Sequence, residues 1–132
     1  MRVVFDTNVL VAALVFPGGR GEQAMQRIVA ERDELVISKA ILDELLGVLA
    51  RKFARDAEDL AHVAVFLGEL ATTVRPARRL RILKDAPDNR ILECAVAGRA
   101  QAIVTGDHEM LALKQYSGTQ ILSLREYLES GN

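Results

Sequence analysis

The sequence predicts an α/β fold in which a central parallel sheet is covered by helices on both faces. Short apolar runs rich in Val and Ile recur along the chain, and such continuous runs are typical of strands buried on both sides. Segments with helical periodicity separate these runs, and this alternation favours a parallel sheet. The chain has 132 residues, a length at which we expect one domain, spanning residues 1–132.

The first half of the chain is expected to provide two strands and three helices. Asn8 can cap a first short helix, and Ser38 is a favourable N-cap for a longer one. Residues 17–21, Pro-Gly-Gly-Arg-Gly, predict a flexible loop. In the helix that follows, Ile28 and Val29 belong to the apolar side. The expected elements are a strand over 2–5, helices over 8–15 and 22–32, a strand over 35–37 and a helix over 38–53.

The second half continues the alternation after a long helix that Asp56 can cap. Pro87 suits the first turn of a helix, and Asp88 complements the positive end of its dipole. Residues 75–84 are basic and show no periodicity, so we expect an irregular segment there. The expected elements are helices over 56–70, 85–99, 108–114 and 123–129, a strand-like turn over 72–74, and strands over 102–105 and 119–122.

Composition sets broad limits on function. Half of the residues are hydrophobic and only 5% are aromatic, which predicts an aliphatic core and argues against disorder. The net charge of -1 gives no general attraction to nucleic acid, so a polyanion would need a local basic patch. Cys94 is the only cysteine and is expected to be buried, so a reducing, cytoplasmic location fits. We expect no membrane span, since no apolar run approaches about 20 residues. We also expect no signal peptide, since Asp6 and Asn8 interrupt the apolar N-terminal stretch and no small-residue cleavage site follows.

Two carboxylates follow predicted strands at the edge where ligands bind in open α/β sheets. Asp6 ends the run Val-Val-Phe-Asp, and Asp107 ends Ile-Val-Thr-Gly-Asp. A strand-end turn or a helix cap would explain either residue alone. Two more carboxylates, Glu44 and Asp88, stand beside apolar helix rows, although snorkelling to water and capping are the respective alternatives. Clustered carboxylates repel each other unless a cation intervenes, and oxygen ligands suit Mg²⁺ or Mn²⁺.

Four segments carry a pattern that can be compared with known families. They are Val-Val-Phe-Asp-Thr-Asn-Val-Leu at 3–10, the helix that carries Glu44, Asp-Ala-Pro-Asp-Asn-Arg-Ile-Leu-Glu-Cys-Ala at 85–95, and Ile-Val-Thr-Gly-Asp at 103–107. Together they resemble a PIN domain, and most closely the branch of toxin components of toxin–antitoxin systems that is related to VapC-type ribonucleases. The likeness spans nearly the whole chain in the family's motif order. One departure is Ala86-Pro87, where this branch usually has Pro and an acidic residue.

The resemblance implies a three-layer sandwich and a metal-dependent ribonuclease site. It implies that one or two Mg²⁺ or Mn²⁺ ions are held by an acidic set comprising Asp6, Glu44, Asp88 and Asp107. It further implies supporting roles for Asn8, Thr105 and Asp85. As partners it implies an RNA substrate, a small antitoxin protein and a second copy of the chain in a homodimer.

An acidic site needs positive charge nearby to hold RNA. As individual residues, most basic side chains are explained by a solvated surface. As a group, the basic segment before Asp85 is the best candidate for phosphate contacts, and the glycine-rich loop could bring one further arginine over the site. The candidates are Arg20, Arg75, Arg78, Arg79, Arg81 and Lys84.

Two rival functions use the same residues. A Mg²⁺-dependent phosphatase would also use strand-end aspartates, but it would normally have a second Asp two residues after the first, where this chain has Asn8. A non-catalytic PIN-like module would bind RNA or a partner without cutting, and the complete set of four acids argues against it. Zinc and nucleotide cofactors are not expected, because the chain lacks the required Cys/His cluster and glycine motifs.

Overall fold

A sheet of order β3-β2-β1-β4-β6-β5 forms the centre of the protein in the computed structural model, which describes residues 1–130. All neighbouring strands in it are parallel except β5 and β6, which form an antiparallel hairpin. The strands are β1 (Arg2–Phe5), β2 (Glu34–Ser38), β3 (Thr72–Val74), β4 (Ala102–Val104), β5 (Gln115–Tyr116) and β6 (Thr119–Leu122). The predicted parallel sheet is therefore confirmed.

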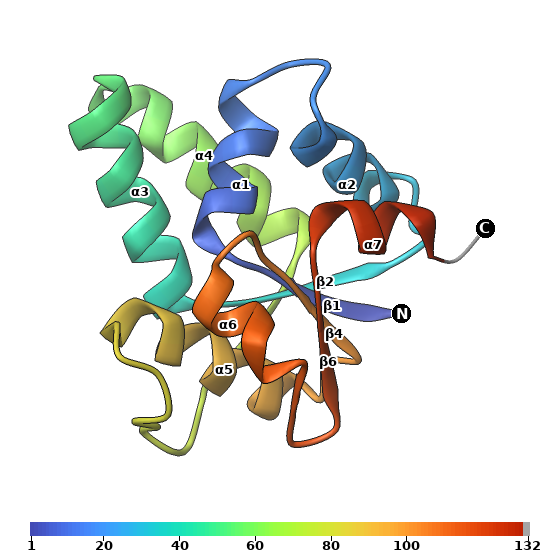
Figure 1. Cartoon of the computed structure of the whole chain (residues 1–132). Helices are drawn as coiled ribbons and strands as arrows, with labels where there is room; N and C mark the ends of the chain where they lie inside the picture. The colour runs from blue at the N-terminus through green and yellow to red at the C-terminus, as the bar shows by residue number, and fades with distance from the viewer. Residues whose placement is uncertain (131–132) are drawn as a thin grey trace.

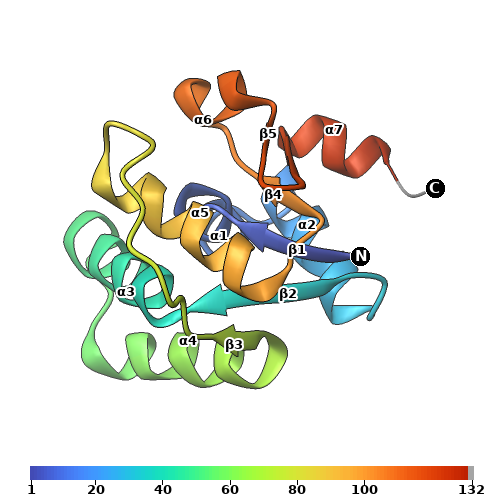
Figure 2. The ribbon, with the colours of Figure 1, turned by 90° about the horizontal axis from the view of Figure 1, so that it is seen from below.

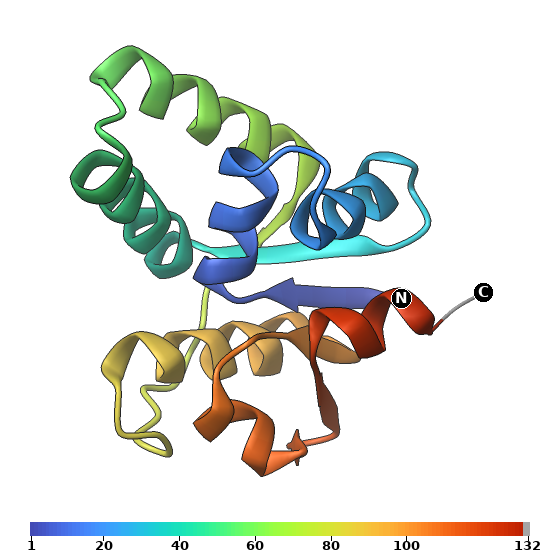
Figure 3. The ribbon, with the colours of Figure 1, turned by 45° about the horizontal axis from the view of Figure 1, so that its top comes forward.

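Helices cover both faces of this sheet, as predicted. Figure 3 shows α1 to α4 above the strands and α5 with α6 below them, and α7 packs against α2. The helices are α1 (Thr7–Val15), α2 (Arg20–Val29), α3 (Lys39–Phe53), α4 (Ala57–Leu70), α5 (Ala86–Gly98), α6 (His108–Leu113) and α7 (Leu124–Glu129). Figure 1 shows their order along the chain. None of these described helices is long and apolar enough to cross a membrane.

The core is aliphatic, as the composition predicts, and it lies on both sides of β1 and β4. Val3, Val4, Ile103 and Val104 are fully buried. Cys94, on the sheet-facing side of α5, is also buried, and this desolvation raises the pKa of its thiol to about 12. The thiol is therefore a small apolar packing group, as expected for that position.

Two predictions about the first helices were wrong. Asn8 does not cap α1, because the chain turns into the helix directly after β1 and Asp6 is the N-cap residue. The carbonyl of Asp6 already accepts from the N–H groups of Val9 and Leu10. Arg20 is not on a loop, because α2 begins at Arg20 with Gly19 before it.

Two further differences concern Val29 and the β5–β6 hairpin. Val29 ends α2 and is 56% exposed, so it does not belong to the apolar side. The hairpin escaped prediction because β5, Gln115–Tyr116, has only two residues and is too short to show an alternating pattern. Its turn residues Ser117 and Gly118 both have positive φ, 50° and 85°, as in the tight turns that favour hairpins.

Candidate active site

The carboxyl ends of β1 and β4 bring Asp6 and Thr105 together. Phe5 pairs with Val104 in the sheet, and each of the two side chains follows directly. The Thr105 hydroxyl donates to Oδ2 of Asp6 over 2.5 Å, and Thr105 Oγ1 accepts from the Asp107 N–H over 3.0 Å. Asp6 is 6% exposed and Thr105 is fully buried. Thr105 therefore fixes the orientation of the Asp6 carboxylate and the path of the chain to Asp107.

Burial raises the pKa of Asp6 above its ordinary value. Hydrogen bonds from Thr105 and from the backbone N–H groups of Asn8 and Thr7 oppose this shift, because they favour the charged form. The negative charge of Asp107 adds to the increase. A nearby cation would favour the ionised form and relieve the cost of burying this carboxylate.

Asp107 both caps a helix and lies among the acids. Its Oδ2 accepts from the Met110 N–H over 2.8 Å at the start of α6. Its charge also acts on Asp6 and Asp88. Asp107 therefore caps α6, as the capping interpretation predicts, and this bond engages one of its two carboxylate oxygens.

Asp88 lies in the first turn of α5, where its helix starts at the same edge of the sheet. Partial burial raises the pKa of its carboxyl to about 6, and the charges of Asp107, Asp6, Asp85 and Glu109 add to this effect. Five carboxylates therefore lie close enough for the charges of four of them to raise the pKa of Asp88. Glu109 was missed by the sequence reasoning, although its position two residues after Asp107 was a signal.

Within residues 1–130, Glu44 is not among the charges that raise the pKa of Asp6 or Asp88. It is half-buried on α3, a helix that packs against both α1 and α5. Asn8 is exposed on α1, and it contacts the site through its backbone N–H, which donates to the Asp6 carboxylate.

The donor chemistry of this edge suits a hydrated, hard cation. Among residues 1–130, no three acidic, His or Cys side chains converge closely enough to form a ready-made metal cage. Mg²⁺ does not require such a cage, because it usually keeps several waters and contacts only one or two carboxylates directly. The residues therefore fit Mg²⁺ or Mn²⁺ through oxygen donors and accumulated negative charge.

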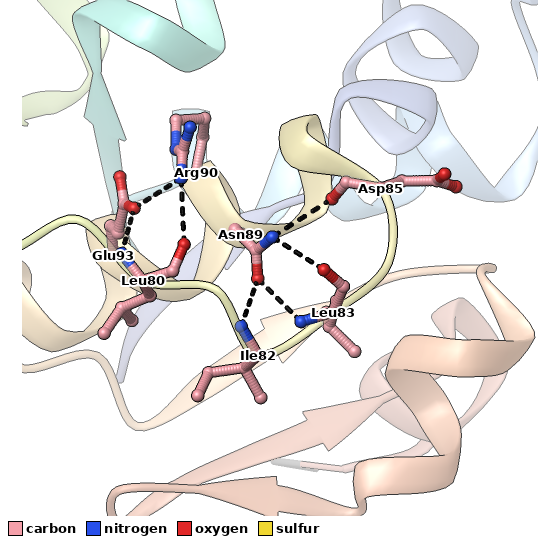
Figure 4. Close-up of polar contacts among 7 residues, drawn as sticks. All are labelled: Leu80, Ile82, Leu83, Asp85, Asn89, Arg90 and Glu93. Carbon is pink, nitrogen blue, oxygen red and sulfur yellow. Dashed lines mark hydrogen bonds and ion pairs between the residues drawn. The ribbon is translucent and has the colours of Figure 1, made fainter.

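A buried amide fixes the chain that leads into the acidic edge. Oδ1 of Asn89 accepts from the N–H groups of Ile82 (3.0 Å) and Leu83 (2.8 Å). Its Nδ2 donates to the carbonyls of Leu83 (2.8 Å) and Asp85 (3.4 Å). Figure 4 shows this side chain reaching from α5 to the segment that precedes it. Asn89, which is only 4% exposed, therefore holds residues 82–85 in one conformation.

A second contact, one turn further along α5, holds Leu80. Oε2 of Glu93 accepts from the Leu80 N–H and from the Arg90 guanidinium, both over 2.7 Å, and Arg90 also donates to the Leu80 carbonyl over 3.1 Å (Figure 4). We call these three side chains, Asn89, Arg90 and Glu93, the α5 clasp. The clasp was not anticipated from the sequence.

Residues 75–85, which we call the clasped segment, connect β3 to α5. This segment runs alongside α5 toward the acidic edge, as Figure 2 shows. It is irregular, as predicted. Its basic side chains point to solvent while its backbone is fixed: Arg75, Arg78, Arg79, Arg81 and Lys84 are all exposed. Arg20 is the first residue of α2, and this helix lies on the opposite face of the sheet from α5 (Figure 3). The structure therefore separates Arg20 from the other basic candidates.

Comparison with known families agrees with this architecture. The model of the PIN domain matches residues 2–109. The chain therefore belongs to the PIN-domain family. The uncharacterized protein MJ1680 of Methanocaldococcus jannaschii is 25% identical over 118 residues, which cover 86% of this chain and 76% of that protein.

Solved structures with the same fold include VapC toxins of toxin–antitoxin systems. VapBC2 from Rickettsia felis, solved with a DNA fragment from its promoter, aligns with a TM-score of 0.65 at 18% identity and covers 93% of this chain and 98% of that one. Mycobacterium tuberculosis VapC20, a Sarcin-Ricin loop cleaving toxin, aligns with a TM-score of 0.61 at 14% identity and covers 89% and 98%. At these identities the likeness establishes the fold.

Proposed function

We propose that this PIN-domain protein is a metal-dependent endoribonuclease that hydrolyses RNA phosphodiester bonds, and that it acts in the cytoplasm as the toxin of a toxin–antitoxin pair. The observation that carries the proposal is the cluster of mutually repelling carboxylates at the carboxyl ends of β1 and β4. Keeping such charges together destabilises the protein, and perturbed carboxylates of this kind gather at functional sites. The structurally similar VapC20 is a Sarcin-Ricin loop cleaving toxin, which supports this reaction for the chain.

Asp6 and Asp107 are the proposed core ligands of Mg²⁺ or Mn²⁺, with Glu44 and Asp88 completing the set. The ion, when bound, supplies positive charge for the phosphate and the leaving oxygen and acidifies a water molecule. Thr105 orients Asp6 through its hydroxyl, and Asp85 adds negative charge at the start of α5.

The chain must also overcome repulsion between its own acids and an RNA phosphate. The exposed basic side chains nearest to the acids in sequence, those of Arg79, Arg81 and Lys84, offer the compensating charge at the cleaved bond, because they lead directly into Asp85. Guanidinium groups match phosphate oxygens in bidentate geometry, which positions a strand without reading its sequence.

A small antitoxin and a second copy of the chain are the proposed protein partners. VapBC2 was solved as a complex on promoter DNA, which supports a partner protein of that kind for this chain. Binding of an antitoxin would hold the ribonuclease inactive until the partner is removed.

The test is cleavage of a mixed set of structured and single-stranded RNAs by the purified protein in Mn²⁺, Mg²⁺ or EDTA. We expect products only with metal, and none with Asp6→Asn. Asp43→Asn is the matched control, since Asp43 is an exposed carboxylate that pairs with Lys39 on α3. Metal binding without cleavage of any RNA would instead identify a non-catalytic binding module. Equal cleavage by the Asp6→Asn protein would refute the assigned site.

A further inference from the structure

A cavity of about 380 Å³ lies beside the clasped segment, away from the acidic edge. Its walls come from three places: the chain after β3, the outer surface of α5, and the β5–β6 hairpin. The residues that define it are Arg75, Arg78, Leu80, Val96, Ala97 and Tyr116. Its volume lies within the range of about 300–1,000 Å³ that is typical of small-molecule pockets, which is enough for one nucleoside.

The chemistry of these walls combines an aromatic ring, aliphatic surface and two guanidinium groups. Arg75 and Arg78 are exposed, and neither forms an ion pair within residues 1–130. Tyr116 is half-buried on β5, so part of its ring surface is available to the cavity. Bases of single-stranded RNA bind by stacking on aromatic rings and Arg planes, and their phosphates bind guanidinium groups.

Hydrogen bonds of the α5 clasp fix part of the cavity wall. Leu80 forms part of its wall, and the α5 clasp bonds both the N–H and the carbonyl of Leu80. Glu93, which is 6% exposed, lines the cavity and carries the clasp contact. A fixed backbone lowers the entropy that would be lost when a ligand orders the wall.

The distance from the acidic edge suits a single RNA strand. Val96 and Asp88 are eight residues apart on α5, which corresponds to about 12 Å at a rise of ~1.5 Å per residue. Stacked nucleotides are spaced by about 3.4 Å along a strand, so about three to four of them span this length. Arg79, Arg81 and Lys84 are exposed on the segment between the two sites.

We infer that the cavity between Arg75, Arg78 and Tyr116 is a nucleotide subsite, which holds one unpaired base of the RNA about three to four nucleotides from the cleaved bond. The base stacks on Tyr116, and the adjoining phosphate is bound by Arg75 and Arg78. This inference rests on the proposed ribonuclease function and adds to it a preference for single-stranded substrates that extend beyond the cleaved bond on one side.

The test compares long and short substrates across matched variants. Arg75→Gln/Arg78→Gln and Tyr116→Leu should raise KM about tenfold on a long oligonucleotide and leave kcat within about twofold. Neither should change KM on an oligonucleotide with only one nucleotide on each side of the cleaved bond, because it cannot reach the cavity. Tyr116→Phe keeps the ring and should behave like the wild type. Arg32→Gln/Arg125→Gln is the charge-matched control, since neither residue lines the cavity.

Equal KM values for all variants on the long substrate, or equal losses on both substrates, would overturn the subsite. Binding of the same oligonucleotides to these variants in an Asp6→Asn background tests it even if no RNA is cleaved, a result that would count against the proposed function alone. There we expect about tenfold weaker binding of the long oligonucleotide to Arg75→Gln/Arg78→Gln and to Tyr116→Leu. The arginine variant should also reduce the salt dependence by about 0.7 in log–log slope, the value for one phosphate contact on a single strand. Unchanged RNA binding with lost binding of an acidic peptide would assign the cavity to a protein segment instead and refute the inference.

Discussion

Replacing Asp88 with Asn should stabilise the protein in EDTA at pH 7.5 and have almost no effect at pH 4. The pKa of Asp88 is raised from 3.8 to about 6 in the folded state. The neutral form is therefore favoured by folding, and the associated stability is present below pH 3.8 and is lost as the pH rises through about 6. At pH 7.5 the folded protein carries the full cost of the ionised carboxylate.

The size of the effect follows from the shift. Each pKa unit corresponds to about 1.4 kcal/mol, so the shift gives about 3 kcal/mol before solvent screening. Asp88 is only partly buried, and screening reduces this to about 1–1.5 kcal/mol. Its charge also interacts favourably with the helix dipole in the first turn of α5, by about 0.5 kcal/mol. Burial and charge repulsion together outweigh the dipole, and we expect a net gain of about 0.5–1 kcal/mol.

Urea unfolding in EDTA at the two pH values measures this difference, with Asp43→Asn as the control for loss of a surface carboxylate. Mn²⁺ should stabilise the wild type more than Asp88→Asn, because the variant lacks one of the proposed ligands. A variant that is less stable than the wild type at pH 7.5, or equally changed at both pH values, would refute the argument that burial and repulsion make the ionised Asp88 unfavourable. Asp88 would then act mainly through the helix dipole.

Four further substitutions test the supports of the site and the packing of the helices. Thr105→Val removes the hydroxyl that holds Asp6 and should reduce stability by about 1–2 kcal/mol and cleavage by about tenfold or more, as measured by unfolding and by kcat. Asn89→Ala removes the hydrogen bonds to residues 82–85 and should reduce stability by about 2–3 kcal/mol, with faster amide exchange in that segment but not in β4. Gly21→Ala places a Cβ 2.7 Å from the Ala13 nitrogen on α1 and should cost about 1–3 kcal/mol. Gly68→Ala on α4, where a Cβ has nothing within 4 Å, should instead gain about 0.5–1 kcal/mol, so equal effects in these two glycine variants would contradict the packing argument.

Much of the fold could be predicted because local signals and tertiary packing agree. Ser38 accepts from the Ile41 N–H and Asp56 accepts from the Asp59 N–H, so both predicted caps start their helices. The prediction for Asn8 was wrong because a better-placed acid precedes it: Asp6 ends a strand and begins a helix without an intervening loop. Cap propensity identifies suitable residue types, whereas the direction in which the chain leaves the sheet decides which of them is used.

The candidate site was predictable in part, for a related reason. Asp6, Asp88 and Asp107 all follow from one rule, since the ends of parallel strands and the starts of crossover helices meet at one edge. Glu109 and the α5 clasp do not follow from it. The roles of Glu109 and the clasp residues depend on the path of residues 75–85 along α5. This segment is irregular, so no periodicity in the sequence predicts its path. Glu109, for example, also accepts from the Lys84 N–H, a contact between residues 25 positions apart.

The clasp explains how a chain with almost no net charge can present both an acidic site and a basic surface. Lys84 and Asp85 are adjacent in sequence, so a mobile segment would allow their charges to neutralise each other or to average out. With Asn89 holding the backbone of residues 82–85, the basic side chains stay exposed on the segment, and Asp85 stays beside the other acids. Loosening this segment through Asn89→Ala should therefore weaken RNA binding even though no charge is removed. An affinity for RNA that is unchanged in this variant, despite faster amide exchange at Ile82 and Leu83, would show that the charges act without a fixed arrangement.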